Sequence, residues 1–364
     1  MKRSSFVVIA FVTAFALGAC GGASQKDAEG FPPAETLAAD SIAINEVLQP
    51  SWCGVYGDYM VLVSPQTSKL IFRYKLPEWT FADSTFVKGG GPDDLQYGFL
   101  EGTNNSDGTF WLSEPVRKAL MKFGTKDGKL EKLRTVANDT RFRVYFGQVL
   151  SDKVLVSEKQ DENNQSTDES KTHLYSAVLG DSLTVADSLL CYTKSAVQIT
   201  QNGEMTYMST RTYNKPALKA WGDRLAVWYG DTQNLLVYKV NGDGKMNLEK
   251  TFGDTLSHAR IESVDVKGYK WEKPTPELIT VTDKYLYFQL ITYDKPFSQA
   301  TRENPPVVVT NEIKVYDWDM KPVRKFELDK KEASRVFVDE PHKKIYAYDR
   351  RLDFEQVYTY DYKL

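Results

Sequence analysis

Short runs of alternating apolar and polar residues recur along the chain, and a polar turn introduces each run. Six paired runs begin at turns that contain Asp58, Asp107, Asp152, Asp223, Asp283 and Lys343. The spacings between these turns are 49, 45, 71, 60 and 60 residues. A period of two predicts β-strands, and repeats of about 40–50 residues with four short strands each are typical of β-propeller blades. The pattern therefore predicts an all-β, six-bladed β-propeller.

Each blade is expected to hold four antiparallel strands. The predicted blades cover residues 52–88, 97–137, 144–190, 196–252, 260–328 and 334–364. The last blade has only three predicted strands, which would leave an open sheet edge. The alternating run at 41–48, SIAINEVL, can supply the missing outer strand and close the ring. The propeller is therefore expected to span residues 41–364.

The amino terminus is predicted to be an export signal. Lys2 and Arg3 precede an apolar stretch from Phe6 to Leu17, which is too short to span a bilayer. Residues 17–20, Leu-Gly-Ala-Cys, resemble the bacterial lipobox, so residues 1–19 are expected to be removed and Cys20 to be acylated. An ordinary signal peptide with a chance cysteine is the alternative. Gly21, in place of an aspartate, favours the outer membrane as the anchoring site.

The segment after Cys20 is small and polar. Residues 20–40 carry a Pro pair and few apolar residues, so they are expected to form a flexible tether. Two cysteines remain beyond it, Cys53 and Cys191. The export route would permit a disulfide between them, but 138 residues separate them, and two buried free thiols are the favoured interpretation.

Composition narrows the function only slightly. The formal net charge is −3 and the pI is near 5.8, which argues against a nucleic-acid binder. Aromatic residues make up 13% of the chain, which suits strands that pack on both faces. The motifs G-x-S-x-G, H-E-x-x-H and the P-loop are absent, and only three histidines occur. We therefore expect no cofactor and no histidine-based metal site.

Several arginines precede predicted inner strands, which converge on the channel of a propeller. These arginines are Arg143, Arg260 and Arg335, with Arg141 and Arg211 in comparable positions. Together they could form a positive ring that binds carboxylate, sulfate or phosphate groups through forked hydrogen bonds. The alternative is that each arginine pairs with an acidic residue of a neighbouring blade.

The glycine-rich run GGGPDD at 89–94 connects the first two predicted blades. Its Asp93 and Asp94 are further candidate ligand-binding residues, because such connections run from the rim to the axis. The run does not match the G-x-G-x-x-G phosphate cradle. The alternative is a tight turn that needs positive φ at glycine.

The lipobox, short tether, six four-stranded repeats and GGGPDD connection together resemble the TolB-like, six-bladed propeller lipoproteins of diderm bacteria. The resemblance implies a cell-envelope binding module for a protein, peptide or glycan, with the membrane as a partner through Cys20. The chain lacks the separate amino-terminal domain of TolB itself, which puts a transfer of its partners in doubt. The alternative is a propeller enzyme of the lactonase, lyase or glycosidase type with its site in the channel.

Overall fold

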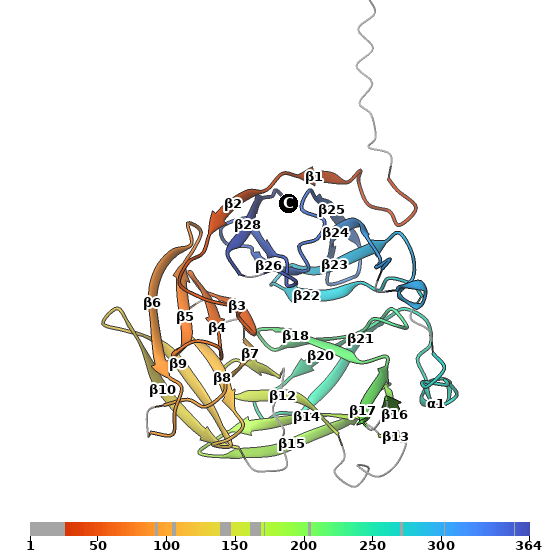
Figure 1. Cartoon of the computed structure of the whole chain (residues 1–364). Coiled ribbons are helices and arrows are strands. Elements are labelled where there is room, and N and C mark those ends of the chain that lie inside the picture. The colour runs from red at the N-terminus through yellow and green to blue at the C-terminus, as the bar shows by residue number, and fades with distance from the viewer. Residues whose placement is uncertain are drawn as a thin grey trace, which may run out of the picture.

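The computed structural model describes a ring of small antiparallel sheets (Figure 1). The described residues are 26–91, 94–103, 107–138, 147–160, 169–170, 172–202, 205–269, 272–301, 303–352 and 354–364. The ring has six blades, as the repeat pattern predicts.

The strands of each blade follow one another from the centre outwards. The strands of blades 1 and 2 are β3 (Trp52–Tyr56), β4 (Tyr59–Val63), β5 (Lys69–Lys75), β6 (Thr80–Val87), β7 (Phe99–Thr103), β8 (Phe110–Glu114), β9 (Ala119–Lys126) and β10 (Lys129–Ala137). Those of blades 3 and 4 are β11 (Gln148–Leu150), β12 (Val154–Gln160), β14 (Thr172–Leu179), β15 (Leu183–Leu190), β18 (Pro216–Trp221), β19 (Arg224–Tyr229), β20 (Asn234–Val240) and β21 (Met246–Phe252).

Blades 5 and 6 each gain a strand from the amino terminus. Blade 5 consists of β22 (Glu277–Val281), β23 (Tyr285–Tyr293), β24 (Val308–Asp317) and β25 (Pro322–Leu328), with β1 (Glu35–Leu37) added in parallel to β25. Blade 6 consists of β26 (Arg335–Asp339), β27 (Lys344–Tyr348) and β28 (Gln356–Asp361), completed by β2 (Asp40–Ala43). Because β2 pairs antiparallel with β28, the predicted ring closure by the run at 41–48 is confirmed, although only its first residues form the strand.

The apolar cores lie between blades. Second strands such as β4 and β8 are buried almost throughout, whereas outer strands such as β6 are largely exposed or half-buried. Six clusters of buried side chains each combine residues of two neighbouring blades. The Trp228 and Phe288 rings, for example, meet edge to face with centroids 4.9 Å apart. Every blade is therefore stabilised by both neighbours.

Three expectations need correction. Residues 194–213 form a separate hairpin, β16 (Lys194–Asn202) and β17 (Met205–Tyr213), which pairs with β13 (Glu169–Ser170). The inner strand of blade 4 therefore begins at Pro216. Residues 258–262 form a short helix, α1 (His258–Glu262), so the inner strand of blade 5 begins only at Glu277. A 3₁₀ turn, η2 (Phe297–Gln299), lies between β23 and β24.

The third correction concerns the amino-terminal tether. A flexible segment was expected over residues 20–40, but residues 26–37 lie along the outer edge of blade 5. Phe31 is completely buried there, and its ring meets that of Tyr316 edge to face at 4.9 Å. Residues 20–25 lie outside the described part of the chain.

Candidate functional site

A cavity of about 1210 Å³ occupies the centre of the ring. About half of its lining residues belong to the inner strands β3, β18, β22 and β26, which surround the centre in Figure 1. Blades 2 and 3 contribute less wall, because their inner strands β7 and β11 pair directly with each other in parallel. The cavity is therefore bordered mainly by blades 1, 4, 5 and 6.

A glycine makes the contact between blades 2 and 3 possible. A Cβ atom on Gly102 would lie 2.0 Å from Nε2 of Gln148, far inside van der Waals contact. The Gln148 amide donates to the carbonyl of Gly147 at 3.0 Å and accepts from the N–H of Ala220 at 3.2 Å. This side chain therefore ties blade 3 to blade 4 at the cavity wall.

Glu101 is a fully buried carboxylate next to this junction. It accepts hydrogen bonds from the Ser113 hydroxyl and from the Gly147 N–H, both at 2.5 Å. The Tyr56 hydroxyl donates to its main-chain carbonyl at 3.1 Å. Burial raises the pKa of Glu101 to about 7, and the two hydrogen bonds to its carboxylate oppose that shift.

Cationic side chains line the cavity at blades 4 and 6. They are Lys215, Lys219, Arg335, Lys343 and Arg350. Among the described residues, Lys219, Arg335 and Arg350 form no salt bridge, whereas Lys215 lies 3.2 Å from Glu158 and Lys343 lies 3.5 Å from Glu340. The cavity therefore holds positive charge that the neighbouring blades do not neutralise by direct pairing.

Burial and neighbouring charges affect these groups differently. Burial lowers the pKa of Lys219; Glu277 on the next blade opposes this shift, and Arg335 adds to it. Burial also raises the pKa of Glu158, and Lys215 opposes that shift. The cavity is thus mixed in charge, with the acids Glu158, Glu277, Asp283, Asp339 and Glu340 in the same wall as the cations.

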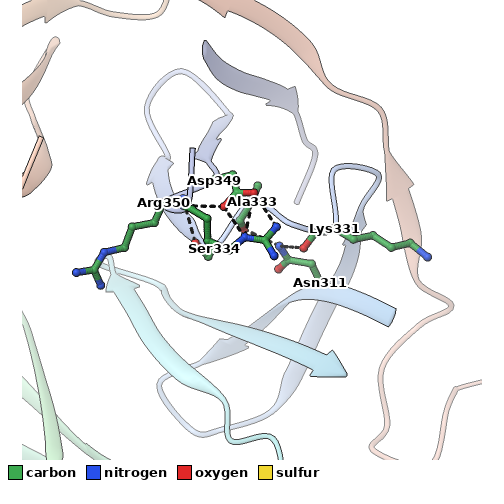
Figure 2. A network of polar contacts seen from close by, with 7 residues as sticks. Asn311, Lys331, Ala333, Ser334, Asp349 and Arg350 are labelled. Atoms are coloured by element: carbon green, nitrogen blue, oxygen red, sulfur yellow. Dashed lines mark hydrogen bonds and ion pairs between the residues drawn. The ribbon is translucent and has the colours of Figure 1, made fainter. Parts of the chain in front are cut away.

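Hydrogen bonds fix the segment that leads into β26. Figure 2 shows the Asn311 side chain among the main-chain carbonyls that precede Arg335. Its amide donates to the carbonyls of Lys331 at 3.1 Å and Ala333 at 2.7 Å. The N–H of Arg350 donates to the Ser334 hydroxyl at 3.3 Å, and its guanidinium extends away from this network in Figure 2. Arg335 and Arg350 therefore project from a well-anchored backbone.

The two cysteines are free thiols, as predicted. Cys53 lines the cavity, and its Sγ lies 3.6 Å from the Tyr348 hydroxyl. Burial raises the pKa of both Cys53 and Cys191 to about 12. Both are therefore protonated at neutral pH, which makes them poor nucleophiles.

Of the arginines predicted to form a ring, Arg335 is the one within the described residues that lines the cavity. Arg335 starts an inner strand and lines the cavity, as expected. Arg260 lies exposed in α1 and does not line it, because blade 5 begins later than predicted. Arg211 is in β17, and its guanidinium donates to the carbonyls of Lys267 and Tyr269 instead. Arg141 and Arg143 lie outside the described residues.

The GGGPDD connection contains a carboxylate folded back on its own turn. Asp94 accepts a hydrogen bond from the Gly91 N–H at 2.7 Å. An added Cβ on Gly89 would lie 2.3 Å from the same carboxylate. None of the three glycines has a positive φ, so the close approach of Asp94 explains Gly89 and Gly91 better than the expected turn type. Asp93 is outside the described part of the chain.

The sequence pattern does not identify five charged residues of the cavity wall, which are Lys219, Lys215, Arg350, Glu158 and Glu277. Lys219 is the single charged residue of the inner strand PALKAW. A charged residue within a short apolar strand that lines a propeller channel is the one signal that could have identified it. Within the described ranges, no three His, Cys, Asp or Glu side chains are grouped closely enough to hold a metal ion. No described helix is long and apolar enough to cross a bilayer.

Comparison with known proteins concerns the fold alone. No family model and no curated protein matches the chain. A member of the DUF4221 family from Bacteroides vulgatus is 11% identical, with a TM-score of 0.48 over 89% of this chain and 98% of its own. A Bacteroides fragilis protein described as exported is 10% identical, with a TM-score of 0.49 over 89% and 94%. A gluconolactonase from Xanthomonas campestris is 11% identical, with a TM-score of 0.43 over 90% and 98%. At such low identity, the activities of these proteins do not transfer to this chain.

Proposed function

We propose that this chain is a lipid-anchored cell-envelope protein whose central channel binds an anionic group of a protein, peptide or glycan. The observation that carries the proposal is the set of three cations, Lys219, Arg335 and Arg350, which line one cavity without a salt bridge among the described residues. Lys219 and Arg335 are half-buried, whereas Arg350 is exposed, and a partly desolvated cation is costly without a counter-charge. A bound anion would supply that charge.

The chemistry of the cavity favours a single carboxylate rather than a polyanion. A guanidinium binds carboxylate oxygens through two parallel hydrogen bonds, and Arg335 can act in this way. The same cavity is lined by acids that would repel further negative charge, namely Glu158, Glu277, Asp283, Asp339 and Glu340. Trp52 also lines it, and its ring lies 5.2 Å from that of Phe99. An aromatic surface of this kind suits the apolar face of a sugar or a ring-bearing side chain.

Calorimetry with small carboxylates tests the proposal. The probes are glucuronate, galacturonate and short peptides with a free carboxyl terminus, each compared with its uncharged amide. At least one acid is expected to bind, and Arg335→Ala should weaken it about 10- to 100-fold, since a charged hydrogen bond contributes about 1.5–3 kcal/mol. Lys129→Ala, which removes one exposed cation from blade 2, is the matched control. Equal affinity in both variants would refute the role of Arg335.

The anchor is tested separately. Cys20 is expected to carry the lipid, so the wild-type chain should incorporate labelled palmitate and float with membranes. Cys20→Ala should lose both properties. A Cys20→Ala variant that still partitions into detergent-rich phases would contradict lipid anchoring and leave the channel ligand unaffected.

A channel enzyme is the second candidate, and one observation favours it. Two carboxylates, Glu158 and Glu277, line the same cavity, and the pKa of Glu158 is raised. Glycoside hydrolysis uses one protonated and one ionised carboxyl group. Turnover of aryl glycosides that disappears in both Glu158→Gln and Glu277→Gln would establish it, and a glycoside panel without turnover would remove it.

A further inference from the structure

The first described residues form a strap, residues 26–37, that is part of the folded ring. Glu35, Thr36 and Leu37 pair in parallel with Phe326, Glu327 and Leu328 of β25. Phe31 has no exposed surface, and Leu37 belongs to the core cluster of blades 5 and 6. The strap is therefore held by main-chain pairing and by buried apolar side chains.

Charged contacts join the strap to the same blade. Both carboxylate oxygens of Glu29 accept hydrogen bonds from the Lys314 ammonium group, at 2.7 and 2.9 Å. Lys314 is only 5% exposed, so its charge needs this partner from the strap. Asp27 pairs with Lys325, and Glu35 pairs with Arg324 at 3.1 Å. The strap thus meets blade 5 at several points rather than at one.

The strap lies on the rim, far from the channel. In Figure 1, β1 runs along the outer edge of the ring, on the opposite side of blade 5 from the inner strand β22. Only residues 21–25 separate Cys20 from the first described residue, Lys26. Five fully extended residues reach at most about 18 Å.

We infer that the strap holds the outer edge of blade 5 against the lipid surface. The mouths of the central channel then open along the membrane rather than towards it. The inference rests on the proposed acylation of Cys20. Because residues 21–25 are so few, the blade on which the strap docks, blade 5, is the part of the ring that lies nearest the lipid. The channel would then receive its ligand from the space along the membrane, without obstruction by the bilayer.

Energy transfer from two positions on the rim tests this orientation. Lys321→Cys places a donor dye on the exposed turn beside the strap, and Lys129→Cys places it on the exposed outer strand of blade 2. The acylated protein is reconstituted into vesicles that contain an acceptor-labelled headgroup lipid. Because a domain of this length is roughly 50 Å across, transfer should be at least about twofold higher from position 321. The wild-type chain, taken through the same labelling, gives the background from the native thiols.

A spacer variant separates orientation from anchoring. Insertion of about 20 Gly and Ser residues after Gln25 gives a flexible tether with a reach of roughly 25 Å, so the difference between the two positions should shrink while flotation with vesicles is retained. Equal transfer from both positions in a floating protein without the spacer would overturn the orientation and leave the anchor intact. A protein that does not float at all would overturn the anchor and the orientation together.

Discussion

Glu101 is the residue at which burial and hydrogen bonding compete most directly. Burial raises its pKa from the ordinary value of 4.5 to about 7. The folded state therefore binds the proton more tightly than the unfolded state, so the free energy of unfolding should fall as pH rises from about 4.5 to about 7. Glu101→Gln should remove this dependence and be more stable above pH 7 by about 1–3 kcal/mol.

Urea unfolding at several pH values, followed by tryptophan fluorescence, measures this prediction. Glu249→Gln is the matched control, since Glu249 is exposed on the outer strand of blade 4. A Glu101→Gln variant that keeps the wild-type slope of stability against pH would show that Glu101 titrates normally in the folded chain.

Single residues also show how far the sequence could locate the site. Arg335 was found because a clear hairpin, β26 and β27, follows it directly. Arg260 was misplaced because α1 and the segment after it come before the short inner strand of blade 5. Lys219 is not identified by the pattern because a lysine usually lies in contact with solvent, even within an otherwise apolar strand, and only closure of the ring turns it towards a cavity.

At the scale of elements, the strap should depend on Phe31. Burying a phenylalanine contributes about 1.5–3 kcal/mol, so Phe31→Ala should favour local undocking of the strap. Amide exchange of residues 35–37 is expected to become about 10- to 100-fold faster, while exchange in blade 2 stays unchanged. Hydrogen exchange with mass spectrometry provides the measurement.

Phe297 offers the control for that variant. It is 59% exposed and packs against Tyr293, whose ring lies 4.8 Å away. Phe297→Ala should leave the protection of the strap at the wild-type level. Unchanged exchange of β1 in Phe31→Ala would mean that the main-chain pairing and ion pairs hold the strap without the phenylalanine.

The elements differ in how well the sequence predicts them. Hairpins such as β19–β20 follow from local alternation and turns, so they were placed correctly. The polar composition of the strap predicts a flexible tether. Its partners Lys314 and Lys325 lie 285 and 298 residues away from Glu29 and Asp27, and a local pattern carries no information about such contacts.

At the scale of the whole molecule, residues 26–43 complete the ring of blades. Strand β2 covers the edge of β28 and β1 covers the edge of β25, so each becomes the short outermost strand of its blade. Deletion of residues 26–43 should expose these edges, and open edges favour pairing between chains. The deleted protein is expected to unfold at a clearly lower temperature and to elute as oligomers.

Deletion of residues 21–25 is the matched control for that experiment, because it shortens the chain ahead of the strap and removes none of the pairing of β1 or β2. Thermal unfolding and size-exclusion chromatography on unacylated protein compare the two deletions.

If the protein without residues 26–43 stayed monomeric with the wild-type midpoint of thermal unfolding, the other inter-blade cores would suffice to hold the ring. Loss of stability in that deletion alone would instead mean that one short segment both closes the propeller and connects it to the proposed anchor. Membrane attachment and folding would then depend on the same contacts.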